Sequence, residues 1–199
     1  MNKLRYSYFQ LTFGQDEAYL HPERSYARLA RCGYDAIEIA PVLPSGVIDL
    51  ERLAAALASG PPALVSVMLA NNETGAIQPV PEVAALVHEA GGILHVDAVQ
   101  AFLKIPININ ALGADVLTVS AHKIGGPKGV GAAVAADGLE GLHAQVRGGG
   151  QEQGRRAGTE NVAGIAGFGA AVRAAAGSMD VDAARMKALQ ARLESGLRD

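Results

Sequence analysis

The chain has 199 residues, of which 49% are hydrophobic and 19% are charged, and its formal net charge is −3. This composition excludes a disordered or fibrous protein, and a general nucleic-acid binder would carry a basic field instead. Cys32 is the single cysteine, which excludes an internal disulfide framework. The sequence has neither an apolar run of 18 residues nor a signal peptide. We therefore expect a cytoplasmic protein without a membrane span.

The first forty residues predict a β-α-β unit. The segment 4–13 (LRYSYFQLTF) has the composition of a strand, Pro22 suits the start of a helix and Gly33 suits its end. The segment 35–40 (DAIEIA) predicts the next strand.

Residues 41–120 continue the alternation of helix and strand. Asp49 suits the cap of a helix over 51–58, and Pro81 opens a second helix that Gly91 closes. Three apolar runs of strand length accompany them: ALVSVMLA (63–70), ILHVD (93–97) and DVLTVS (115–120). The alternation predicts an α/β fold with a mostly parallel sheet flanked by helices.

The C-terminal part begins with a glycine-rich region, since eleven of the 24 glycines lie in residues 121–160. Within it, 130–135 (VGAAVA) predicts a hairpin-like or edge strand. Thr159 is expected to cap a helix that runs to about Ala175. Asp180 or Asp182 is expected to start a last, separate helix with one apolar face, formed by Leu189, Leu193 and Leu197.

Polar residues follow three of the predicted strands: Asn71 and Asn72, then Asp97, then the run 120–123 (SAHK). In an open parallel sheet, ligands bind outside the carboxyl ends of the strands. A carboxylate and a lysine beside a hydroxyl and an imidazole suit a phosphorylated aromatic aldehyde. The lysine forms a Schiff base, the acid pairs with the ring nitrogen, and the polar groups bind the phosphate. Each residue alone has a commoner structural explanation, so the ordered combination is what indicates the cofactor.

Four long segments, VSVMLANNETGAIQPV, HVDAVQ, SAHKIGGPKGVGA and RGGGQEQGRRAGTENVAGIAG, resemble those of the cysteine desulfurases, in the class V aminotransferase group of fold-type I pyridoxal-phosphate enzymes. The resemblance covers about residues 41–199 and implies part of the large domain of such an enzyme, with pyridoxal 5'-phosphate as cofactor. It implies that cysteine is converted to alanine plus an enzyme persulfide for iron–sulfur cluster assembly. The expected partners are a second copy of the chain and a sulfur-acceptor scaffold protein.

The resemblance implies roles around the cofactor ring. Lys123 would carry the cofactor and shuttle protons, and Asp97 would contact the pyridine nitrogen. Asn72 and Gln100 would bond the ring hydroxyl.

It also implies roles around the cofactor phosphate. Ser120 and His122 would bind it, and Thr159 would reach the phosphate of the partner subunit, which makes the site a property of a homodimer. Gln153 stands where family members often have arginine. No metal site is expected.

Two parts of the family pattern have no counterpart in the sequence. These are the N-terminal phosphate-binding loop with its ring-stacking histidine and the cysteine that accepts sulfur; Cys32 precedes the matching region and suits a small core residue. We therefore expect an incomplete desulfurase. The alternatives are a non-catalytic fragment or fusion that binds the cofactor weakly or not at all, and a related class V aminotransferase or selenocysteine lyase.

Residues 1–40 show a short resemblance to the opening of the sugar-phosphate isomerase/epimerase barrels. This predicts a segment of different origin over 1–40, joined near 35–41 to a cofactor-binding fragment over 41–199.

Overall fold

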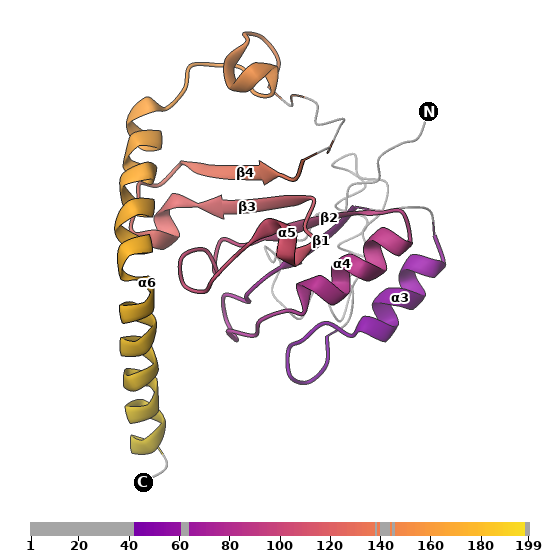
Figure 1. Ribbon diagram of the computed structural model, residues 1–199, viewed down its shortest axis with the longest axis vertical. Helices are drawn as coiled ribbons and strands as arrows, with labels where there is room; N and C mark the ends of the chain where they lie inside the picture. Colours follow the sequence, from indigo (N-terminus) through magenta and orange to yellow (C-terminus); the bar gives the residue numbers. More distant parts are fainter. Residues whose placement is uncertain (1–41, 61–63, 138, 140–143, 145, 198–199) are drawn as a thin grey trace, which may run out of the picture. The chain divides into compact units, whose positions relative to one another are not determined.

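The computed structural model describes residues 42–60, 64–137, 139, 144 and 146–197 (Figure 1). The predicted N-terminal β-α-β unit, the junction near 35–41 and Cys32 lie outside the described residues. Helices and strands alternate in the order α3 (Leu50–Ala58), β1 (Leu64–Met68), α4 (Val80–Glu89), β2 (Ile93–Asp97), α5 (Ile109–Leu112), β3 (Val116–Ser120), η1 (Ala121–Ile124), β4 (Gly131–Ala135), η2 (Gln151–Gly154) and α6 (Val162–Gly196).

The strands form a four-stranded sheet in the order β1-β2-β3-β4. Strands β1 and β2 are parallel, with Leu64 opposite Ile93 and Met68 opposite Asp97. Strand β4 lies at the edge, runs opposite to β3 in Figure 1, and exposes all five of its residues. The prediction of a mostly parallel sheet flanked by helices is confirmed, and so is the edge position of 130–135.

By its internal contacts, the chain divides into two units. The first combines the described residues up to Asp97 with Ile109–Leu117, and the second combines Ala98–Asn108 with the described residues from Thr118 onward. The first unit holds most of the buried side chains. Helix α4 supplies Val80, Val83, Ala84 and Val87 to this core, at the spacing that puts them on one helical face.

The predicted helix boundaries in the first unit are confirmed by their capping contacts. Asp49 Oδ1 accepts a hydrogen bond of 3.1 Å from Arg52 N at the start of α3. At the end of α4, Gly91 adopts φ 71° and its N donates to His88 O. Only glycine adopts this left-handed conformation without steric cost, which is why the chain leaves the helix there.

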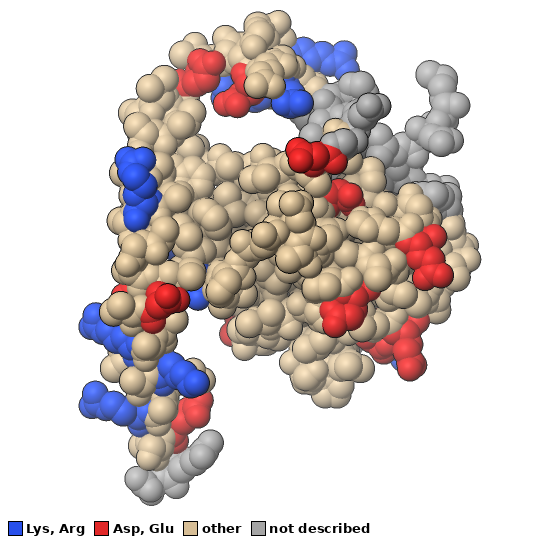
Figure 2. Space-filling model, in the orientation of Figure 1, with Lys and Arg blue, Asp and Glu red and all other residues tan. Residues whose placement is uncertain are grey.

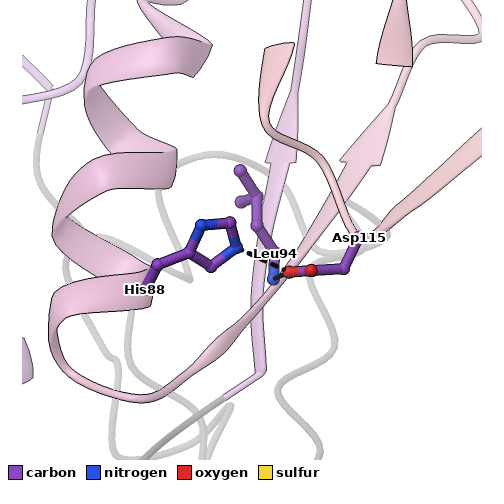
Figure 3. A network of polar contacts seen from close by, with 3 residues as sticks. All are labelled: His88, Leu94 and Asp115. Atoms are coloured by element: carbon purple, nitrogen blue, oxygen red, sulfur yellow. Dashed lines mark hydrogen bonds and ion pairs between the residues drawn. The ribbon is translucent and has the colours of Figure 1, made fainter. Parts of the chain in front are cut away.

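A polar cluster joins α4 to the starts of β2 and β3 (Figure 3). Asp115 Oδ2 accepts a hydrogen bond of 2.7 Å from Leu94 N and lies 2.9 Å from His88 Nε2. The carboxylate therefore ties three elements of the first unit together. The sequence does not predict this cluster, because His88 and Asp115 are 27 residues apart.

The prediction of two C-terminal helices is wrong, because α6 is one helix of 35 residues. Its cap is Asn161, whose side chain accepts from Gly164 N, and not Thr159. The helix continues through the expected break between Ala175 and Asp180, where Ser178 Oγ donates a 2.6 Å hydrogen bond to Asp182 Oδ2. A glycine inside a helix costs about 1 kcal/mol, which is too little to end a helix that propagates on both sides.

Of its residues, α6 buries only Gly164. The second half of α6 and the residue that caps its end expose what we call the apolar face of α6: Met186, Leu189, Leu193 and Leu197. Charged side chains of both signs accompany them on the lower half of the helix in Figure 2. By length and hydropathy alone α6 could cross a membrane, but one such helix is weak evidence because core helices of soluble proteins pass the same test.

Candidate functional site

The first unit contains two of the predicted site residues, Asn72 and Asp97. Asp97 ends β2 with a half-buried side chain, and its carbonyl oxygen accepts a 2.9 Å hydrogen bond from Leu69 N just after β1. Asn71 Oδ1 accepts from the backbone N of residues 73 and 74, both at 2.9 Å, and so builds the turn after β1. Asn72 is exposed in that turn, where its side chain is available to a ligand.

His95 lies on the same sheet face as Asp97, because the two are two residues apart on β2. Ser66 Oγ and His95 Nδ1 are hydrogen-bonded at 2.7 Å across β1 and β2. Burial lowers the pKa of His95, although the negative charge of Asp97 acts in the opposite direction. Asp97 therefore has beside it an imidazole whose lowered pKa favours the neutral form at neutral pH. His95 is not among the site residues that the sequence predicts.

The second unit brings Ser120, His122 and Lys123 together at the end of β3. The chain leaves the strand through the short helix η1, and Ser120 Oγ is 2.8 Å from His122 Nδ1. His122 and Lys123 are exposed, and Gly125 ends the helix with φ 80°. A hydroxyl, an imidazole and a primary amine thus lie within four residues of a surface helical turn.

Gln100 lies in a tight turn that directly follows β2. The turn begins with hydrogen bonds from Ala101 N and Phe102 N to Ala98 O, at 3.0 and 2.8 Å. Gln100 Oε1 accepts a 3.3 Å hydrogen bond from Lys104 Nζ. Burial lowers the pKa of Lys104, and the positive charge of Lys123 lowers it further. The turn of Gln100 and the amine of Lys123 therefore lie within electrostatic reach of each other.

The first half of α6 supports both segments of the second unit. The rings of Phe102 and Phe168 pack edge to face, with centroids 6.4 Å apart. At Gly167 a Cβ atom would come within 2.7 Å of Pro127 Cγ, so glycine lets α6 approach the segment after η1. The close approach explains why glycine stands at position 167.

Thr159 is exposed in the loop before α6. Arg156 Nη1 donates to the carbonyl oxygens of Gly158 and Thr159, at 2.9 and 3.2 Å, and so orders the backbone there. Gln153 adopts a left-handed φ of 57°, and its Oε1 accepts from Arg155 Nη1 at 3.2 Å. An arginine at 153 has no acceptor and would repel Arg155, so glutamine at this position gives the loop a contact that arginine cannot make.

The predicted site residues thus fall into two groups. Asn72 and Asp97 belong to the first unit, and the others belong to the second: Gln100, Ser120, His122, Lys123 and Thr159. By residue type these side chains suit a phosphorylated pyridine aldehyde, since they offer an amine, a carboxylate, a hydroxyl and an imidazole. Over the described residues, no group of three or more histidine, cysteine, aspartate or glutamate side chains could hold a metal ion.

Comparison with curated proteins finds cysteine desulfurases. The chain is 49% identical to the cysteine desulfurase of Gluconacetobacter diazotrophicus over 76% of this chain and 38% of the relative. It is 47% identical to that of Sinorhizobium fredii over 79% of this chain and 40% of the relative. The predicted resemblance is confirmed, and the chain spans about two fifths of the length of these relatives.

Comparison with solved structures supports the fold. A NifS-like protein from Rickettsia africae superposes with a TM-score of 0.80 at 38% identity, covering 86% of this chain and 48% of that chain. DndA from Streptomyces lividans superposes with a TM-score of 0.72 at 36% identity, covering 91% and 51%. The fold is therefore that of part of a NifS-like fold-type I enzyme.

The family itself is shown by a match over most of the sequence. The model described as Aminotransferase class-V matches residues 23–199, a range that contains every predicted site residue. Membership of this family implies a pyridoxal-phosphate cofactor. The chain belongs to the class-V aminotransferase family.

Proposed function

We propose that this chain forms the cofactor-binding part of a pyridoxal-phosphate-dependent cysteine desulfurase. The complete enzyme would convert cysteine to alanine and leave the sulfur as a persulfide on a protein thiol, as a source for iron–sulfur clusters. The carrying observation is the cluster of Ser120, His122 and Lys123 on η1, in a chain 49% identical to a cysteine desulfurase.

Lys123 and Asp97 would contact the two chemically important groups of the cofactor, its aldehyde and its ring nitrogen. The amine of Lys123 would hold the cofactor aldehyde and, once released from it, would carry a proton to and from the substrate. The carboxylate of Asp97 would keep a positive charge on the ring nitrogen. When bound, the cofactor acts as an electron sink that makes the α-proton of an amino acid acidic.

The remaining residues would orient the cofactor. Asn72 and Gln100 bond the ring oxygen, and Ser120 with His122 binds the phosphate. Thr159 would reach the cofactor of a partner subunit. A homodimer and a cytoplasmic location are part of this proposal.

The substrate assignment is supported by a structural neighbour. SspA, solved in complex with cysteine, superposes with a TM-score of 0.65 at 33% identity and covers 76% of this chain and 43% of that chain. We propose cysteine as the substrate and a sulfur-acceptor scaffold protein as a partner. The persulfide thiol is assigned to none of the described residues.

Trapping the cofactor on the protein tests the proposal. The purified chain is incubated with pyridoxal phosphate, reduced with borohydride and digested, and the modified peptide is identified by mass spectrometry. We expect the label on Lys123, loss of that label in Lys123→Ala, and retention in the matched control Lys128→Ala. A wild-type chain that gains no reducible bond at saturating cofactor would refute the cofactor assignment.

A second assay separates the reactions. Sulfide release from cysteine with reductant present supports a desulfurase, and its absence in a cofactor-loaded chain supports the non-catalytic alternative. Amino-group transfer to a keto acid, or selenide release from selenocysteine, would instead indicate the related family activities.

A further inference from the structure

The turn that carries Gln100 contains a second amine, on Lys104, to which the proposed function gives no role. Lys104 lies four residues after Gln100, and its Nζ donates a 3.3 Å hydrogen bond to Gln100 Oε1. Both side chains are half-buried. A partly buried ammonium group needs a protein acceptor, because it loses part of its hydration.

An ammonium group decides which end of an amide faces it. It has three donors and no acceptor, so Gln100 must turn its carbonyl oxygen toward Lys104. Gln100 Nε2, which only donates, is then available to a different group. That group must be an acceptor, such as a deprotonated oxygen on an aromatic ring.

The backbone fixes the spacing between Gln100 and Lys104. Lys104 N donates to Ala101 O at 3.0 Å, and Leu103 reverses the chain with a left-handed φ of 55°. Phe102 packs its ring against α6. Strained backbone of this kind persists only where the surroundings hold it, and it is concentrated at functional sites.

Lys104 also belongs to the surroundings of Lys123. The positive charge of Lys123 adds to the effect of burial in lowering the pKa of Lys104. Gln100, Lys104 and Lys123 therefore share one region of the second unit, and a cofactor held by Lys123 would lie within reach of the other two.

We propose that Lys104 is a positioning residue of the cofactor site, which holds the Gln100 amide with its nitrogen free to donate to the ring oxygen of the cofactor. The inference rests on the proposed function, because the cofactor supplies that oxygen. Its test therefore has one part without the cofactor and one part with it.

The first part follows the side-chain amide signals of Gln100 by NMR in the cofactor-free full-length chain. We expect Lys104→Met, which keeps the apolar stem, to shift these signals. Lys104→Arg, which still only donates, should restore them, and Lys187→Met on α6 is the matched control without effect. Unchanged Gln100 signals in Lys104→Met would overturn the inference.

A measurement on the unmutated chain covers the case in which Lys104→Met fails to fold. Raising the pH deprotonates Lys104, and the Gln100 amide signals should titrate with the same midpoint as the Lys104 Cε signal. In Lys123→Met this midpoint should move to higher pH, because a neighbouring positive charge is removed. If the Gln100 signals change with a midpoint different from that of Lys104 Cε, or if the midpoint does not move in Lys123→Met, the proposed contact between Lys104 and Gln100 is contradicted.

The second part measures the dissociation constant of pyridoxal phosphate by its absorbance. Lys104→Met should bind about three- to tenfold more weakly, which is the range of one net hydrogen bond. Lys104→Arg should stay within about twofold of the unmutated chain. If the unmutated chain takes up no cofactor, the proposed function fails and this inference falls with it. If it binds and Lys104→Met binds equally well, only the inference fails.

Discussion

Helices α4 and α6 carry similar aliphatic residues in different surroundings. Val80, Val83 and Val87 of α4 are 0% exposed, whereas Leu193 of α6 is 64% exposed. Both segments show apolar residues at helical spacing, so the spacing predicts helical structure in each segment but not what covers its apolar face. Substitutions in the two regions should therefore differ in their cost, and that difference can be measured.

The largest expected difference is between two leucines. Leu94→Ala removes a side chain that is 0% exposed and packed beside α4, and should lower the free energy of unfolding by about 2–5 kcal/mol. Leu193→Ala on α6 should change it by less than about 0.5 kcal/mol. Urea unfolding of both variants measures the two costs. Equal losses would mean that the apolar face of α6 is covered in solution.

Substitutions in the polar cluster around Asp115 should cause the second largest losses in the free energy of unfolding. Asp115→Ala leaves Leu94 N without its 2.7 Å acceptor and should cost about 1–3 kcal/mol. His88→Gln, which can still donate to the carboxylate, should cost less. Thermal unfolding of both variants tests the order, and a larger loss in His88→Gln would contradict the assignment of Asp115 as the central group.

The pH dependence of stability should reveal His95. Its pKa is lowered in the folded chain, so the unfolded chain binds a proton more readily. The stability that neutral His95 contributes is complete above the ordinary value of about 6.5 and is lost as the pH falls through the lower, folded value. Unfolding free energies between pH 7 and pH 5 should decline less in His95→Gln than in the unmutated chain. Parallel curves would refute the role.

Two glycines give the smallest expected contrast. Gly177 of α6 has ordinary helical surroundings in which a Cβ meets nothing within 4 Å, so Gly177→Ala should stabilise the chain by about 0.4–1 kcal/mol. Gly113 adopts φ 66°, and a Cβ there would lie 2.8 Å from Ala84 Cβ of α4. Gly113→Ala should therefore destabilise, by about 1 kcal/mol or more. The same sign for both in calorimetry would contradict this comparison.

Local signals in the sequence are sufficient to predict the strands, α3 and α4. They also predict which strands the polar residues of the site follow. Asp49 and Gly91 act through hydrogen bonds to residues a few positions away, so their effect is visible in the sequence itself. The prediction of two helices in place of α6 is wrong, because the glycine between Ala175 and Asp180 is a weak helix former that neighbouring turns can override. At the other end, Thr159 and Asn161 are both favourable cap residues, and the backbone places Asn161 at the start of α6.

Other contacts around the site join residues that are brought together only by the fold, so residue spacing in the sequence does not predict them. Ser66 meets His95 only through the register of β1 with β2. Lys104 contacts Gln100 because the chain turns at Leu103, and a single lysine in the sequence gives no sign of that turn. The individual roles of Asn72, Asp97, Gln100, Ser120, His122, Lys123 and Thr159 stay predictions.

The continuity of α6 has a mechanical consequence. At about 1.5 Å per residue, a helix of this length is a rod of roughly 50 Å. Near the N-terminal end of this helix, Phe168 packs against Phe102 in the turn of Gln100, and Gly167 lies against Pro127 in the segment after Lys123. A force or a binding partner that moves the C-terminal end of α6 would therefore also move the turn of Gln100 and the segment after Lys123. A flexible break at Gly177 would have prevented this transmission along the helix.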